Sequence, residues 1–96
     1  MLNKEKIIRT LRDHQADIRR FGVKRLGLFG SFARGEQKAS SDLDFVVELE
    51  PKTFDAYMGL KQFLEELFDC HVDLVLPNTL KPRLKAQILQ ELVDAA

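Results

Sequence analysis

The fold is decided by residues 26–48, which read Leu-Gly-Leu-Phe-Gly-Ser-Phe-Ala-Arg-Gly-Glu-Gln-Lys-Ala-Ser-Ser-Asp-Leu-Asp-Phe-Val-Val-Glu. An apolar strand ends in a tight turn at Gly30 and Ser31. A polar link follows, and a second strand then opens with Asp42 and Asp44. We expect the rest of the chain to support these pieces.

Three aspartates are predicted to share one face of a sheet. Side chains alternate faces along a strand, so Asp42 and Asp44 point the same way, with Cα atoms roughly 6.6 Å apart. A third strand-like run, residues 71–76, carries Asp73 opposite to its apolar neighbours. A helix between the second and third strands is typical of a parallel pair, which would place Asp73 beside Asp44.

Carboxylates crowded in this way point to a divalent cation. They repel one another and resist joint ionisation, and a hard cation removes that penalty. Oxygen ligands suit Mg²⁺, which usually takes one or two carboxylates and completes its shell with phosphates and water. Two Mg²⁺ ions, about 3.5–4 Å apart, hold the attacking and leaving oxygens of an in-line displacement.

The Gly-Ser turn is the predicted phosphate site. Gly30 allows a backbone to approach a ligand closely, and Ser31 offers a hydroxyl and a cap for the following short helix. N–H groups at such a helix start attract phosphate oxygens. A nucleoside triphosphate would therefore rest on Gly30 and Ser31 and share its metals with the aspartates. Each motif alone is a common turn or strand start, and only the combination is specific.

Several charged residues have two open interpretations. Arg34 either reaches back to a phosphate or to the acceptor, or pairs with Glu36 at the surface. Arg83 and Lys85 are expected to be solvated, with contact to the triphosphate as the alternative. Glu48 shares the carboxylate face and is expected at its solvated rim.

The rest of the chain supplies the supporting elements. The pattern predicts helices over residues 3–20, 53–68 and 81–93 and strands over 23–29, 43–49 and 71–76. Asn3 and Thr53 are the predicted N-caps of the first two helices. The broad apolar face of helix 53–68 predicts deep burial against the sheet.

Length and composition are those of one domain, residues 1–96. Lys+Arg and Asp+Glu balance at 15 each, so net charge gives no sign of a polyanionic partner. No apolar run approaches the ~20 residues that span a bilayer, and the N-terminus does not read as a secretory signal. The single cysteine, Cys70, cannot form an internal disulfide, which favours a cytoplasmic location.

These residues resemble a known family. Gly30-Ser31 followed by Asp42-x-Asp44 resembles the signature of the DNA polymerase β-like nucleotidyltransferases. The longer string Gly-Ser-Phe-Ala-Arg-Gly-Glu…Ser-Asp-Leu-Asp and the later Val-Asp-Leu-Val run resemble the minimal nucleotidyltransferases, also called MNT or MntA-like proteins. The resemblance extends over nearly the whole chain.

The resemblance implies a fold and a set of site residues. The fold would be α/β (α+β), a small mixed sheet flanked by helices in the order α-β-short α-β-α-β-α. Asp42, Asp44 and Asp73 would correspond to the catalytic, metal-binding carboxylates. Gly30 and Ser31 would correspond to the phosphate-holding turn.

The resemblance also implies an activity and a partner. MntA-like chains are often the antitoxins of HEPN ribonuclease toxins. The family transfers AMP from ATP to a tyrosine hydroxyl of that toxin, with Mg²⁺ as the metal. Neither a membrane nor direct nucleic-acid binding is expected, and a complex with the partner is.

Two other functions stay open from the sequence. The chain could silence its partner by binding alone, as a non-catalytic nucleotide-binding antitoxin. It could also transfer a nucleotide to an RNA end or to a small-molecule hydroxyl, although the neutral net charge argues against RNA.

Overall fold

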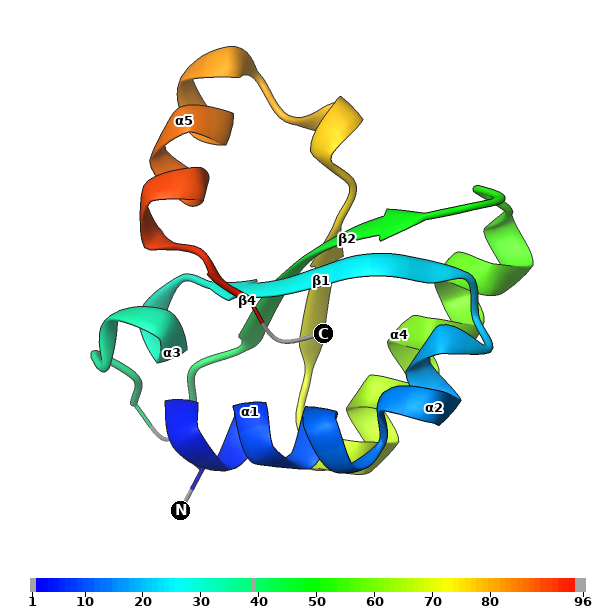
Figure 1. Ribbon diagram of the computed structural model, residues 1–96. Helices are drawn as coiled ribbons and strands as arrows, with labels where there is room; N and C mark the ends of the chain where they lie inside the picture. Colours follow the sequence, from blue (N-terminus) through cyan, green and yellow to red (C-terminus); the bar gives the residue numbers. More distant parts are fainter. Residues whose placement is uncertain (1, 39, 95–96) are drawn as a thin grey trace.

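A four-stranded mixed sheet with the strand order β3-β2-β1-β4 organises the computed structural model, which describes residues 2–38 and 40–94 (Figure 1). The strands are β1 (Val23–Phe29), β2 (Leu43–Leu49), β3 (Val72–Val75) and β4 (Val93–Asp94). The helices are α1 (Lys4–Asp13), α2 (Gln15–Arg19), α3 (Ser31–Arg34), α4 (Phe54–Phe68) and α5 (Pro82–Glu91), with a 3-10 turn η1 at Pro77–Thr79.

β1 and β2 have the predicted bounds, and β3 is shorter than the predicted 71–76 by one residue at each end. β1 and β2 are antiparallel and are joined through α3, while β2 and β3 are parallel and are joined by α4. The long α4 is the crossover that a parallel pair requires. The prediction of a mixed sheet flanked by helices is therefore confirmed.

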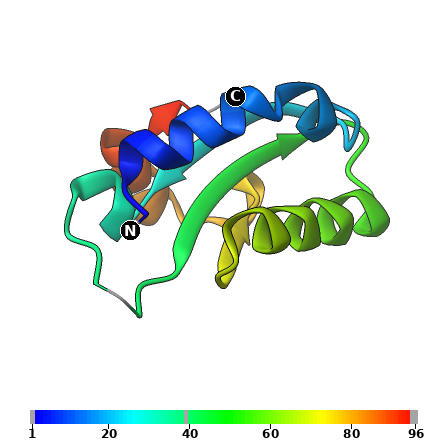
Figure 2. The ribbon, with the colours of Figure 1, turned by 90° about the horizontal axis from the view of Figure 1, so that it is seen from below.

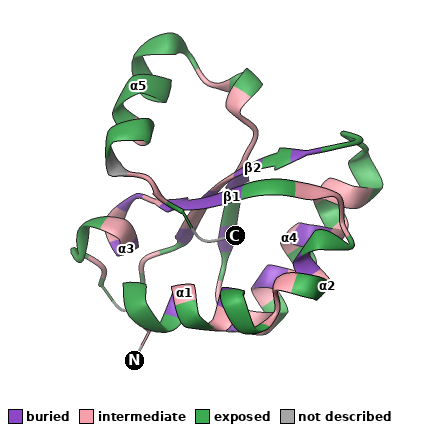
Figure 3. Ribbon diagram, in the orientation of Figure 1, coloured by how far each residue is buried: buried purple, intermediate pink, exposed green. Residues whose placement is uncertain are grey.

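The core lies between the sheet and the layer formed by α1, α2 and α4 (Figures 2 and 3). Leu43, Phe45 and Val47 of β2 are fully buried on this side, as alternation along the strand requires. Leu60 and Leu64 of α4 are fully buried in the same core. Asp44 and Val46, which point to the opposite face, are only partly buried.

The two predicted N-caps are confirmed. Asn3 Oδ1 accepts a hydrogen bond from the backbone N–H of Lys6 at 2.9 Å, and Thr53 Oγ1 accepts one from that of Ala56 at 3.1 Å. Each cap satisfies a donor that a helix start leaves unpaired.

The predicted single helix over residues 3–20 is wrong, because the chain breaks into α1 and α2 at His14. His14 leaves helical geometry at φ −110° and ψ 20°, and its backbone N–H is shared between the carbonyls of Thr10 and Leu11. Its ring Nδ1 also lies 2.9 Å from the Thr10 carbonyl oxygen. Such shared bonds are common where a helix ends.

The C-terminal region also differs from the prediction. The helix predicted over 81–93 ends at Glu91, and the chain then forms β4, which pairs antiparallel with Gly27 and Leu28 of β1. The apolar side of α5 does not enter the core, since Leu84 and Leu89 are 49% and 55% exposed.

The broad apolar face of α4 is buried along most of its length but not at its start. Phe54, the first residue of α4, is 76% exposed. No helix in the described part of the chain is long and apolar enough to cross a membrane.

We expect Gly22→Ala to destabilise the protein more than Gly35→Ala does. Both glycines have positive φ, at 88° and 74°, so alanine at either position costs about 1–2 kcal/mol. A Cβ at Gly22 would also lie 2.8 Å from the carbonyl oxygen of Glu50, whereas a Cβ at Gly35 meets nothing within 4 Å. Urea unfolding of the two variants measures the difference, and equal losses would contradict this packing.

Candidate active site

The register of the sheet brings the predicted site residues to one end of β2. Asp44 pairs with Asp73 across the parallel β2–β3 ladder and with Phe29 across the antiparallel β1–β2 ladder. Gly30 directly follows Phe29, and Asp42 directly precedes β2. The predicted placement of Asp73 beside Asp44 is confirmed, as is the adjacent Gly-Ser turn.

Gly30 fits closely against a carboxylate. Its backbone adopts φ 79° and ψ −155°, a region that only glycine occupies without strain. A Cβ at this position would collide with Oδ2 of Asp44. The turn therefore lies against the carboxylate, and a larger residue would push the two apart.

The turn after Gly30 leaves backbone donors for a ligand. Gly30 is the N-cap of α3 and offers no side-chain hydrogen bond to its first N–H groups. Such groups must be satisfied by water or by a bound acceptor. Ser31 lies at the start of α3 and is half-buried. The arrangement is suited to an anion such as a phosphate.

The charge on the carboxylate face perturbs one aspartate. Partial burial, together with the nearby charges of Asp73 and Asp42, raises the pKa of Asp44 from 3.8 to about 6. The positive charges of Arg34 and His71 act in the opposite direction. An additional cation near Asp44 would lower its pKa, because the positive charge stabilises the ionised carboxylate.

Arg34 and His71 both lie at the edge of this site. Arg34 Nε is 3.1 Å from Glu36 Oε2, as the surface interpretation expects, and its charge nevertheless reaches Asp44. His71 Nδ1 lies 3.5 Å from Asp42 Oδ2, and no sequence pattern specifies this contact. The only sequence signal was its place two residues before Asp73, on the same face.

The other charged candidates are exposed. Arg83 and Lys85 are exposed on α5, in agreement with the solvated interpretation. Glu48 is exposed further along the face of β2, as expected for a rim residue.

The carboxylates match the ligand chemistry of a magnesium ion. Within the described residues, no three His, Cys, Asp or Glu side chains converge as a ready metal cage. Mg²⁺ does not need one, because phosphates and water complete its shell around one or two carboxylates. Asp44 and Asp73 supply such a pair, with Asp42 beside them.

The sheet order, the Gly-Ser turn and the paired aspartates together define a nucleotidyltransferase. The chain belongs to the nucleotidyltransferase domain family, whose sequence profile matches residues 5–95. It is similar to the protein adenylyltransferase MntA of Thermococcus cleftensis, with 39% identity over 97% of this chain and 96% of that protein.

Two solved structures extend this comparison. One, provisionally described as a minimal nucleotidyltransferase, is 35% identical with a TM-score of 0.83, covering 96% of this chain and 95% of that one. The other, a toxin–antitoxin crystal structure with AMP-PNP, is 30% identical with a TM-score of 0.69, covering 99% of this chain and 73% of that one.

We expect Asp44→Asn to stabilise the ligand-free protein at pH 8. Because the pKa of Asp44 is raised, folding loses stability as the pH rises from 3.8 through about 6 and this carboxyl must ionise in the folded state. The neutral amide removes that loss, so the gain should vanish below pH 3.8.

Urea unfolding at several pH values measures this effect, with Glu48→Gln as the matched control. Glu48 lies on the same face of β2 but is exposed, so its amide variant should follow the wild type. A stability gain for Asp44→Asn that does not change with pH would contradict the electrostatic explanation.

Proposed function

We propose that this protein transfers AMP from ATP to a hydroxyl group, a tyrosine, of a partner HEPN ribonuclease toxin and so acts as its antitoxin. The observation that carries the proposal is the pairing of Asp44 with Asp73 against Gly30. The likeness to a protein adenylyltransferase MntA and to a toxin–antitoxin holding AMP-PNP supports the substrate and the partner.

Each site residue has a role in this proposal. Gly30 and Ser31 hold the phosphates of ATP through the backbone and the hydroxyl. Asp42, Asp44 and Asp73 would hold magnesium ions, which when bound neutralise the phosphate charge and lower the pKa of an acceptor hydroxyl. Arg34 is assigned to a phosphate oxygen, because its charge already reaches Asp44.

The reaction is an in-line displacement at the α-phosphate. The acceptor oxygen forms a bond to the α-phosphorus, the bond to the bridging oxygen breaks, and pyrophosphate leaves. Asp73 is exposed and lies at the outer strand of the pair, so it is the carboxylate that the acceptor hydroxyl reaches and to which it passes its proton. Positioning and charge neutralisation carry most of the rate.

A second function shares the same site. The chain could bind nucleotide and silence its partner by complex formation alone, without transfer. The observation that favours it is the likeness to a toxin–antitoxin crystal structure with AMP-PNP, in which nucleotide and partner occur in one complex. The two functions differ in whether the partner becomes covalently modified.

We expect the partner toxin to acquire label from ATP labelled at its α-phosphate and none from ATP labelled at its γ-phosphate. Asp44→Asn should reduce transfer by at least about a hundred-fold, because it removes a charge that acts in the transition state. Mass spectrometry of the toxin locates the adduct. A toxin that is silenced but unlabelled would establish the binding-only function.

We expect Mg²⁺ to raise the melting temperature of the wild-type protein at pH 8 and to do so much less in Asp44→Asn and Asp73→Asn. Burial and the charges of Asp73 and Asp42 raise the pKa of Asp44, and a bound cation offsets both effects, so it binds the folded state preferentially. Glu48→Gln serves as the control and should respond like the wild type. Equal shifts in all four proteins would contradict a site at these carboxylates.

A further inference from the structure

The last helix bridges the open face of the sheet. β3 and β4 are the two edge strands, and the chain between them runs through η1 and α5. It therefore passes above β2 and β1, on the side opposite α1, α2 and α4 (Figure 1). No described side chain of α5 is fully buried. We call the segment from η1 to α5 the arch, because it crosses this face and is joined to the sheet at both ends, through β3 and β4.

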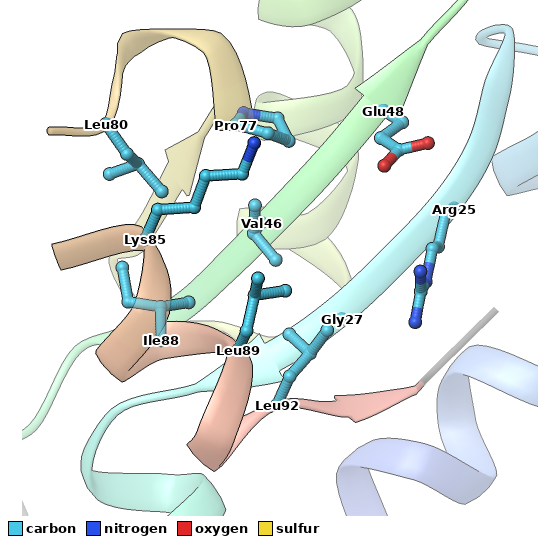
Figure 4. Close-up of a pocket in the computed structure, with 10 residues that line it drawn as sticks. All are labelled: Arg25, Gly27, Val46, Glu48, Pro77, Leu80, Lys85, Ile88, Leu89 and Leu92. Carbon is cyan, nitrogen blue, oxygen red and sulfur yellow. The ribbon is translucent and has the colours of Figure 1, made fainter. Parts of the chain in front are cut away.

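A pocket lies between this arch and the sheet (Figure 4). Its floor is formed by Gly27 and Val46, which are paired residues of β1 and β2. Its apolar walls come from the η1–α5 segment, namely Pro77, Leu80, Ile88, Leu89 and Leu92. Charged side chains of Arg25, Glu48 and Lys85 stand at its rim.

A glycine is required on the floor of this pocket. A Cβ at Gly27 would overlap the side chain of Leu92, so only glycine lets Leu92 approach the sheet. Glycine in the middle of a strand is otherwise unfavourable and marks a close approach. Gly27 thus brings the end of α5 down onto β1.

The pocket continues the candidate active site along the same two strands. Val46 follows Asp44 on one face of β2, roughly 6.6 Å away, and Gly27 precedes Gly30 by about 10 Å along β1. A triphosphate on Gly30 and Ser31 therefore ends where the pocket begins. The remainder of the nucleotide either enters this pocket or stays in solvent.

We infer that the pocket binds the base of the nucleoside triphosphate, between Val46 on the floor and Leu89 on the arch. The inference rests on the proposed function. A base is planar, with apolar faces and polar edges, and so it matches a slot with aliphatic walls and a charged rim. Leu89 is 55% exposed beside the pocket, and a bound base would cover it.

The chain offers a matched pair of variants for a test. Leu84 and Leu89 are both exposed leucines of α5, but only Leu89 lines the pocket. Calorimetry would measure the affinity of each variant for ATP and for inorganic tripolyphosphate, which lacks a nucleoside. Leu89→Ala should weaken ATP binding about five-fold and Leu84→Ala less than two-fold. Tripolyphosphate binding should be unchanged in both.

A second pair of variants fills the pocket instead of enlarging it. Val46→Phe places a ring on the floor and should weaken ATP binding at least about ten-fold while sparing tripolyphosphate. Leu67→Phe adds a ring to α4, on the other side of the sheet, and should leave both affinities unchanged.

The outcomes separate this inference from the proposed function. If the wild type binds ATP no more tightly than tripolyphosphate, the base pocket is wrong and the phosphate site stands. If Leu89→Ala and Val46→Phe bind ATP normally but lose transfer to the toxin, the pocket serves the acceptor and the inference is overturned. If the wild type binds neither ligand, the proposed function fails and the inference fails with it.

Discussion

The parallel pairing of Asp44 with Asp73 is the constraint on which the structure depends. Backbone hydrogen bonds between β2 and β3 fix two carboxylates side by side, so they cannot move apart to relieve their repulsion. Partial burial is the largest cause of the raised pKa of Asp44, and the charges of Asp73 and Asp42 add to it. Arg34 and His71 offset only part of these effects, since the pKa of Asp44 stays raised to about 6.

The hydrophobic core stabilises the fold against the unfavourable placement of these carboxylates. Beneath the carboxylates, the alternate residues Leu43, Phe45 and Val47 are fully buried against α1, α2 and α4. Hydrophobic burial of this kind contributes several kcal/mol per pair of large side chains, more than one raised pKa removes. The strand that bears Asp44 is therefore also packed against the core along its whole length.

The sequence was sufficient for the parts that follow from local pattern and a single crossover. Alternation set the bounds of β1 and β2, and the helix between β2 and β3 predicted the placement of Asp73. It was insufficient where tertiary contacts decide. β4 has two residues in the described part of the chain and forms by pairing with the edge of β1. The contact of His71 with Asp42 depends on how the chain enters β2 and β3. The pocket beneath α5 depends on the pairing of β4 with β1, so the hydrophobic pattern of the sequence did not predict it.

The direction of the strands divides the open face into two halves. Because β1 runs antiparallel to β2, its end brings Gly30 and Ser31 to the same place as the start of β2 and its aspartates. The opposite half of that face is covered by α5, which reaches it only because Gly27 admits Leu92. Anionic and apolar parts of one elongated ligand are thus accommodated on one surface: charge at the strand end near Gly30, and aliphatic walls further along β1 and β2.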